Sequence, residues 1–495
     1  MKSGQPAKAS IALAAALALC ACSTGARKPD LALPAAYEAP PGTAILAPEA
    51  LDTWWTIFGD PELDGLERDA LRLSPDARTQ EARLVEAGAT RASGVWQTYP
   101  TGDITGSASK KHTSPIGAPP SSLVPVGGVS ESDVADFKVS WELDFLGGLA
   151  TQRHALAADY AATRFNVEGA RATLVANVAD SYFQARGLAI QLADADVSVK
   201  IESELLGIAD TKASLGLGPT SDADRIAGQL DQAKSQAESL AAQLHVAQRE
   251  LLILVGRGIE PVEDLPVSAD VPDPPPVPRA VPGELLARRP DVREADWRMR
   301  AAALRTKLAK EQIFPNLVLQ PAAGLARTVA PGIGVASIVP LLLFPQQQTT
   351  ATSYWSYGVG LDQPVLDIPR LLQDAKAQGA RTEQAVIAYE KAVQSAYGDA
   401  EDALVSLAAD EQRLVVLNDG EVRAHRAYEA AKLGYQAGVD DLTTALTAEQ
   451  DWRTDRAALT AERVQALRRA VQVYNALGGG WGYGAPGPAQ ARRAP

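Results

Sequence analysis

Side chains with catalytic or metal-binding chemistry are few in this sequence, and they do not form a known active-site motif. Its four histidines, His112, His154, His245 and His425, are scattered, and none has the spacing of a metal-binding motif. There is no GxSxG nucleophile motif, no phosphate-binding loop and no dinucleotide fingerprint. The sequence therefore predicts a protein that is not an enzyme and that needs no metal or other cofactor.

The two cysteines, Cys20 and Cys22, lie at the end of an N-terminal leader. Two lysines precede an apolar run over residues 9–19, a pattern typical of a secretory signal peptide and too short for a membrane span. Cys22 follows a small residue, as in the signals of bacterial lipoproteins, whereas Cys20 follows the large Leu19. We predict that residues 1–21 are removed and that Cys22 is lipidated. The alternative is that both cysteines are incidental parts of a discarded leader.

Acidic residues gather at two turns and admit two interpretations. Asp222 and Asp224 lie at one turn, and the pair Asp440 and Asp441 lies at the other. They could be metal ligands, but carboxylates are also favoured at helix N-termini by capping and by the helix dipole. We favour capping, and the spacing of Ser221 and Asp224 predicts a helix cap there.

The chain contains two copies of one sequence unit. Pro75 matches Pro290 at an offset of 215 residues, and Gly218 matches Gly438 at an offset of 220. The second offset also places three residues of one alternating segment onto three of another: Phe137, Val139 and Trp141 onto Tyr357, Val359 and Leu361. A nearly constant offset over such a distance predicts two internal repeats with the same order of elements.

Each repeat contains two predicted strands separated by a loop rich in Gly, Pro and Ser. The clearest strand is FKVSWELDF, residues 137–145, in which apolar and polar residues alternate and so give one apolar and one polar face. The apolar face could be covered by a soluble core or by lipid. Four strands cannot close a membrane barrel, which needs at least about eight. Either they join a soluble sheet, or several chains build one barrel together.

Long helices occupy most of the rest of each repeat. Helices of about 25 residues are predicted over residues 76–97 and 291–313, and residues 149–215 and 370–435 contain no proline. Apolar and small residues at alternating spacings of three and four predict a close-packed seam: Val386, Tyr389, Val393, Ala396, Ala400, Ala403 and Leu407. Turns at residues 215–222 and 435–441 reverse each long helix into a return helix.

Composition agrees with packed helices and excludes one class of partner. Aromatic residues make up 5% of the chain and charged residues 22%, which suits long helices packed on one another. The formal charge is −13, and no basic patch stands out, which argues against nucleic acid as a partner.

Several motifs together resemble one protein family. WWTIFGDPELDGL, ELLARRPDVREADWRMRAA, KEQIFPNLVL, SWELDFLGG and YNALGGGW are similar to motifs of the TolC-like outer-membrane factors, the outer-membrane lipoproteins of tripartite efflux systems. The similarity runs over residues 52–481. It implies a mixed α and transmembrane β fold: a homotrimer in which each chain gives four strands to a 12-stranded β-barrel and its helices to a long periplasmic α-barrel.

The resemblance also implies a domain order and a function. The order is a signal peptide (1–21), a lipidated extended segment (22–50), a first repeat (51–257), a proline-rich equatorial linker (258–282), a second repeat (283–480) and a flexible tail (481–495). The function is that of a passive exit duct for small toxic compounds. Its expected partners are outer-membrane lipid, a periplasmic adaptor protein and an inner-membrane pump of the resistance-nodulation-division class.

The resemblance also implies roles for particular residues. Phe137, Val139, Trp141, Tyr357 and Val359 are expected to face lipid. The turns are expected to be periplasmic tips that contact the adaptor, through Gly216, Gly218, Ser221 and Gly438. A periplasmic gate is expected nearby: Tyr435, Asp224, Asp440, Thr447 and Glu449.

The predicted gate departs from the family pattern at two positions and suggests one bond. Thr447 stands where relatives carry an acidic residue, Asp440 stands where some carry a basic one, and Glu449 is a candidate to compensate. We expect Tyr435 and Asp224 to form a hydrogen bond across neighbouring hairpins.

Two other functions share parts of this pattern. An outer-membrane exit channel for protein secretion would have the same architecture. A structural periplasmic coiled-coil lipoprotein would explain the helices but not the alternating strands.

Overall fold

A computed structural model describes residues 29–40, 51–114, 128–275, 282–284, 288–333 and 345–480. Cys22, the signal peptide and the C-terminal tail lie outside these residues, as do parts of the predicted loops and linker. The chain divides into two compact units, and each draws on both sequence repeats. The first contains residues 88–159 and 299–385, and the second contains residues 28–87, 160–298 and 386–495.

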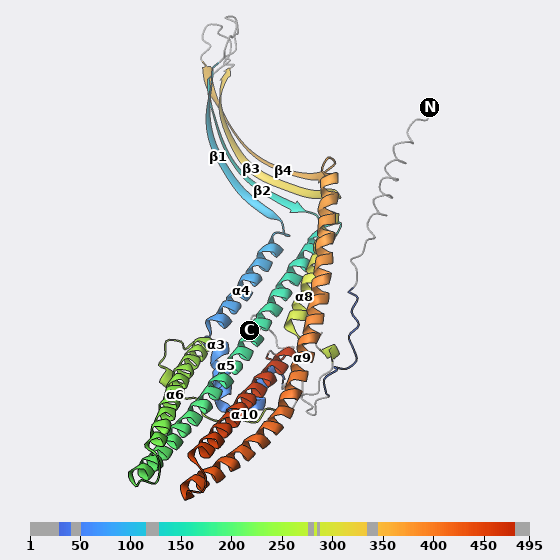
Figure 1. The fold of residues 1–495 in the computed structure, drawn as a ribbon. Coiled ribbons are helices and arrows are strands. Elements are labelled where there is room, and N and C mark those ends of the chain that lie inside the picture. Colours follow the sequence, from blue (N-terminus) through green and yellow to red (C-terminus); the bar gives the residue numbers. More distant parts are fainter. Residues whose placement is uncertain are drawn as a thin grey trace, which may run out of the picture. The chain divides into compact units, whose positions relative to one another are not determined.

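A four-stranded antiparallel sheet forms the body of the first unit (Figure 1). Its strands are β1 (Thr101–Thr113), β2 (Gly128–Glu142), β3 (Asn316–Ile333) and β4 (Pro345–Asp362), in the order β1-β2-β3-β4. The first repeat supplies β1 and β2, the second supplies β3 and β4, and the β2–β3 ladder joins them. The prediction of four strands is confirmed.

Strand β2 ends three residues earlier than the alternation predicts. Residues 143–145 lie beyond Glu142, although the Leu143 amide still donates to the Leu317 carbonyl at 2.8 Å. The Asp144 carboxylate accepts the amides of Leu149 and Ala150, the first turn of the next helix. The chain therefore leaves the sheet because Asp144 caps a helix, a contact that an alternating pattern does not reveal.

The helices of the two repeats have matching lengths. Helices α4 (Pro75–Trp96) and α8 (Pro290–Glu311) have 22 residues each, and α6 (Thr220–Leu254) and α10 (Leu442–Ala476) have 35 each. The long helices α5 (Gly148–Ser214) and α9 (Ile368–Ala437) have 67 and 70 residues. These bounds confirm the predicted long helices and their returns. Among the described residues, no helix is both long and apolar enough to cross a membrane.

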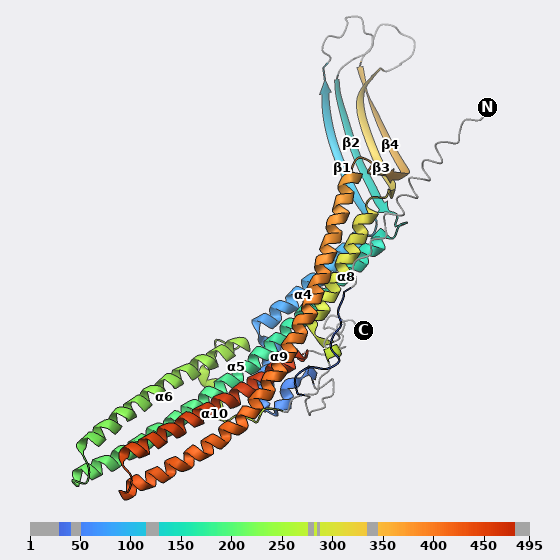
Figure 2. The ribbon, with the colours of Figure 1, turned by 45° about the vertical axis from the view of Figure 1, so that its right-hand side comes forward.

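Two helical hairpins, α5–α6 and α9–α10, lie side by side in the second unit (Figure 2). The predicted seam of α9 is buried: Val386, Val393, Ala396, Ala400 and Leu407 are at most 2% exposed. Its small side chains allow the helices to approach closely, as their spacing predicts.

The second unit has an aromatic-rich core. The short helix η1 (Trp54–Phe58) and helix α3 (Pro61–Leu73) pack there against α5, α6 and α10. Trp54 is fully buried and stacks on Tyr474 with 5.8 Å between ring centroids, and burial raises the pKa of Tyr474 to about 12. Short helices η2 (Val262–Asp264) and η3 (Pro282–Glu284) lie in the connection between the repeats.

Candidate functional site

The tips of the two hairpins have the same backbone design. Gly216 and Gly438 have φ values of +71° and +74°, which side chains other than glycine rarely allow. The amide after each glycine reaches back across the turn: Leu217 donates to the Lys212 carbonyl at 2.8 Å, and Val439 donates to that of Gly434 at 2.9 Å.

This design corrects the pairing of the tips between repeats. Gly216 corresponds to Gly438 at an offset of 222, whereas the sequence comparison matched Gly218 at an offset of 220. Gly218 lies two residues beyond the left-handed position, and its own φ is not positive.

The helix caps at the two tips differ. Asp441 caps α10, because its carboxylate accepts the Thr444 amide at 2.7 Å and this bond lowers the pKa of Asp441. The predicted cap from Ser221 is wrong: α6 begins at Thr220, and the capping position is Pro219, whose side chain cannot accept a bond. The extended backbone of Pro219 already directs the chain into the helix, so Ser221 falls inside the first turn.

Tyr435 is held by the opposite hairpin through Lys212. Tyr435 is 4% exposed, the Lys212 ammonium lies 3.7 Å from its ring centroid, and the same nitrogen donates to the Tyr435 carbonyl at 2.7 Å. Burial, and then the charge of Asp222, raise the pKa of Tyr435. Among the described residues of one chain, Tyr435 makes no hydrogen bond to Asp224, which is exposed. Their bond across neighbouring hairpins stays a prediction.

The other predicted gate residues occupy different environments. Asp440 and Thr447 are exposed, so both side chains are free to face solvent. Glu449 is 1% exposed and lies inside its own chain near Arg453, and burial raises its pKa. This burial is at odds with Glu449 as a charge in a ring around an open aperture.

A row of ion pairs joins α5 to α10, and the sequence did not predict it. Arg468 binds both carboxylate oxygens of Asp180, at 2.7 and 2.9 Å. Further along, Arg456 pairs with Asp194, and Arg453 lies 3.7 Å from Glu202. We call these three pairs, with the Lys212–Tyr435 contact, the inter-hairpin seam. The sequence contains acids along α5 and arginines in the opposite order along α10, which is compatible with such pairs. Predicting which acid meets which arginine would have required the alignment of the two helices.

The sheet of the first unit has an exposed apolar band on one face. Cross-strand partners place Trp141 beside Leu319, and Leu319 beside Val359, on the same face. The large side chains of this face are exposed to solvent in the single chain: Ile104, Phe137, Trp141, Leu325, Trp355, Tyr357, Val359 and Leu361. Val139, of the same face, is half-buried. The predicted lipid-facing residues therefore lie together.

Charged pairs bound this apolar band on the side of the predicted loops. Lys110 lies 2.7 Å from Glu131, and Arg327 lies 3.8 Å from Asp133, on the same face as the band. Along β3 the band runs from residue 317 to residue 325, which is about 26 Å at the rise of an extended strand.

The opposite face of the sheet is polar. The Tyr354 hydroxyl donates to Asp136, and Lys138 lies 3.3 Å from the other oxygen of that carboxylate. Gly324 leaves room for this contact, because a Cβ there would lie 2.3 Å from Asp136 Oδ1. The sheet thus has one apolar and one polar face, as the alternation predicts.

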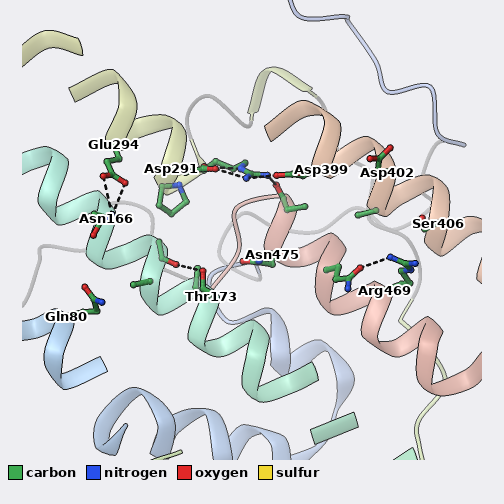
Figure 3. Close-up of a pocket in the computed structure, with 18 of the residues that line it drawn as sticks. Gln80, Asn166, Thr173, Asp291, Glu294, Asp399, Asp402, Ser406, Arg469 and Asn475 are labelled. Atoms are coloured by element: carbon green, nitrogen blue, oxygen red, sulfur yellow. Dashed lines mark hydrogen bonds and ion pairs between the residues drawn. The ribbon is translucent and has the colours of Figure 1, made fainter. Parts of the chain in front are cut away.

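A polar pocket of about 760 Å³ lies in the second unit where α8 begins (Figure 3). Arg289 connects the elements that line this pocket. It binds Asp291 and Asp399 and donates to the carbonyls of Ala396 and Ala476. Asn166 closes another side through Glu294, at 3.2 Å. The arginine joins α8, α9 and the end of α10, which is a structural role. Among the described residues, no cluster of His, Cys, Asp or Glu could hold a metal ion.

The sequence profile of the outer membrane efflux protein family matches residues 66–257 and 281–479, one segment for each repeat. The chain belongs to this family. Among curated relatives, the efflux protein is 29% identical over 479 residues to the pyoverdine export outer membrane protein OpmQ of Pseudomonas putida, covering 94% of this chain and 96% of that one. It is 26% identical over 466 residues to the toluene efflux pump outer membrane protein TtgC of the same species, covering 90% of each.

Solved structures agree with the fold. The efflux protein superposes on the outer-membrane channel OprN with a TM-score of 0.75 and 25% identity, covering 92% of this chain and 99% of that one. It superposes on the outer membrane channel CmeC of Campylobacter jejuni with a TM-score of 0.78, covering 94% and 98% at 19% identity. The predicted fold class, four strands with long helices in two repeats, is confirmed, and the chain is an outer-membrane efflux component.

Proposed function

We propose that three copies of this efflux protein form one continuous duct from the periplasm through the outer membrane. The observation that carries this proposal is the sheet, whose apolar face is exposed in one chain and whose outer strands β1 and β4 each have one unpaired edge. Unpaired edges and exposed aromatic side chains are unfavourable in water, but both are accounted for if copies join edge to edge in lipid. Three copies would supply 12 strands, enough for a membrane barrel.

The same arrangement assigns the faces of the sheet. The band with Trp355 and Tyr357 would face lipid, and the face with Asp136, Lys138 and Tyr354 would face the water-filled lumen. Lys110 and Arg327, with their acidic partners, would lie at the outer lipid headgroups, where charge is tolerated.

Lipid would also hold the N-terminus. We propose that Cys22 is the acylated first residue, which would anchor the mature chain in the outer membrane. Residues 29–40 run along α9 in the same direction as the helix. The amide of Asp30 donates to Glu390, and the amides of Glu38 and Ala39 donate to Glu401. Mass spectrometry of membrane-extracted protein should find an acylated N-terminal peptide that begins at Cys22. A mature N-terminus elsewhere and without lipid would contradict the anchor.

The hairpin tips would contact the periplasmic adaptor and, through it, a resistance-nodulation-division pump. Leu215, Leu217 and Val439 are between 66% and 81% exposed around Gly216 and Gly438. Apolar side chains on turns that glycine shapes offer a small contact surface for another protein. We propose that small toxic compounds or secreted metabolites, delivered by that pump, leave through the duct without chemical change.

The purified protein in planar bilayers tests the duct. We expect stepwise conductance from a species whose mass by native mass spectrometry is three chains. A deletion strain should also accumulate a fluorescent efflux substrate, and the intact gene should restore export. A monomeric protein without conductance would refute the trimeric duct, and loss of protein secretion with normal export of small molecules would favour a secretion channel.

A further inference from the structure

Two buried glutamates share one arginine between the hairpins of the second unit. Glu202 on α5 and Glu449 on α10 are each 1% exposed. The Nη1 atom of Arg453 lies 3.7 Å from Glu202 Oε1 and 3.5 Å from Glu449 Oε2. The other oxygens, Glu202 Oε2 and Glu449 Oε1, have no hydrogen-bond partner. The cluster thus holds two carboxyl groups and one compensating positive charge.

Among the described residues, no second positive charge pairs with this cluster. Lys432 on α9 lies 3.7 Å from Glu204, and Arg456 on α10 pairs with Asp194. Titratable groups of α9 also face this region: Glu421, His425, Tyr428 and Glu429. His425 stacks on Trp452, and its Nε2 lies 3.9 Å from the exposed Glu429. The Tyr428 hydroxyl is buried without a partner.

Two ionised carboxylates at this site would be unfavourable. Together with Arg453 they would leave one net negative charge in a desolvated interface, where burial favours the neutral form of an acid. Burial, and then the charge of Glu449, raise the pKa of Glu202 to about 7. Burial raises the pKa of Glu449 as well, although Arg453 opposes that change. The two groups titrate as a pair, and the last proton is lost near neutral pH.

We propose that Glu202, Glu449 and Arg453 form a carboxyl latch, which holds the two hairpins of a chain together while the pair retains one proton and weakens when both carboxyl groups ionise. The inference rests on the proposed duct, because it gives that duct a response to periplasmic pH. It differs from the predicted gate, which included Glu449 as a residue at the aperture, because Glu202 and Glu449 are both buried inside the chain.

The sign of the response follows from linkage. The packed hairpins bind the proton more tightly than a solvated glutamate does, whose ordinary pKa is 4.5. The packed state is therefore free of penalty below about pH 4.5 and becomes less favoured as pH rises to about 7, above which the penalty is constant. A difference of about 2.5 pH units corresponds to at most about a 300-fold change in the equilibrium between packed and separated hairpins per chain.

Infrared spectroscopy tests the retained proton without requiring a working channel. The detergent-solubilised protein should show carbonyl absorption of protonated, buried carboxylic acids at about pH 6, and the component from Glu202 and Glu449 should disappear near neutral pH. Glu67, whose pKa burial also raises, adds a component that the parent and all variants share. Glu449→Gln should remove that titration, because one neutral amide leaves Glu202 paired with Arg453. Asp451→Asn, an exposed change on the same helix, should leave the band unchanged. A parent protein without a component that titrates near neutral pH, or a Glu449→Gln variant that keeps this component, would overturn the latch.

Single-channel recording tests the consequence. The open probability of the parent and of Asp451→Asn should rise between about pH 5 and pH 8, by at most about 300-fold per chain. Glu449→Gln and, independently, Glu202→Gln should stay at the low value of the parent at acid pH. A conducting parent that does not respond to pH, or Gln variants with the parental response, would refute the latch and leave the duct intact. A protein that never conducts but shows the infrared titration would count against the duct alone.

Discussion

Lys212→Met should open the periplasmic end of the duct, because Lys212 is the residue of α5 that holds Tyr435 of the opposite hairpin. Methionine keeps the aliphatic length but removes the charge and all three donors. The change deletes the hydrogen bond to the Tyr435 carbonyl, at 2.7 Å, and the contact of the ammonium with the ring, at 3.7 Å.

The size of the effect follows from these two contacts. A hydrogen bond from a charged donor contributes about 1.5–3 kcal/mol, and a cation–π contact contributes about 0.5–2 kcal/mol. Lys212 is only half-buried, so the lower ends apply and the link is worth about 2 kcal/mol per chain. That value corresponds to about a 30-fold change in the closed-to-open ratio for each hairpin pair.

Planar-bilayer recording of purified trimers measures this change directly. We expect a higher open probability for Lys212→Met and an unchanged melting temperature of the trimer, since the contact belongs to a small cluster at the tips and not to the aromatic-rich core that contains Trp54. Lys200→Met is the matched control, because Lys200 is an exposed lysine twelve residues earlier on the same helix. Intact Lys212→Met trimers that conduct like the parent and like the control would show that this contact does not hold the hairpins closed.

Other variants test the lipid-facing side of the sheet, the cap of α10 and the predicted bond between hairpins. Trp141→Lys should lower trimer yield, since a lysine facing the middle of the membrane costs about 2–4 kcal/mol. Ser140→Lys, on the other face, should have a mild effect. Equal loss of folded trimers on a gel for both variants would disprove the lipid assignment. Asp441→Ala should destabilise the first turn of α10 by removing its cap, measured as faster amide exchange at the second tip, and unaltered exchange would exclude the cap. Tyr435→Phe with Asp224→Ala should raise conductance of intact trimers if the two residues bond across hairpins; a variant that only melts earlier would argue for packing and local capping instead.

Repetition and periodicity determined much of the fold from the sequence alone. Alternation predicted β2 and β4, and uninterrupted helical periodicity predicted α5 and α9, because both signals depend on residues that are near one another in the chain. The seam along α9 was predicted for the same reason. The polar and apolar faces of the sheet also followed, because side chains of a strand point alternately to its two sides.

Contacts between distant residues could not be predicted in this way. The inter-hairpin seam depends on how α5 and α10 are aligned, and a shift of one turn would pair its arginines with other residues. The burial of Glu449 depends on the same alignment, and the attachment of Tyr435 to Lys212 depends on how α5 and α9 are aligned.

Two local predictions were wrong, because capping contacts close in the chain do not show in alternation or in a capping-box spacing. Asp144 ends β2 because it binds the start of α5, and Pro219 takes the capping position that Ser221 was expected to hold. The sequence thus determined which elements form and which faces are apolar, because these properties arise from neighbouring side chains. Only the tertiary structure decided which charges meet between hairpins, because electrostatic pairing depends on distances that the packing of whole helices sets.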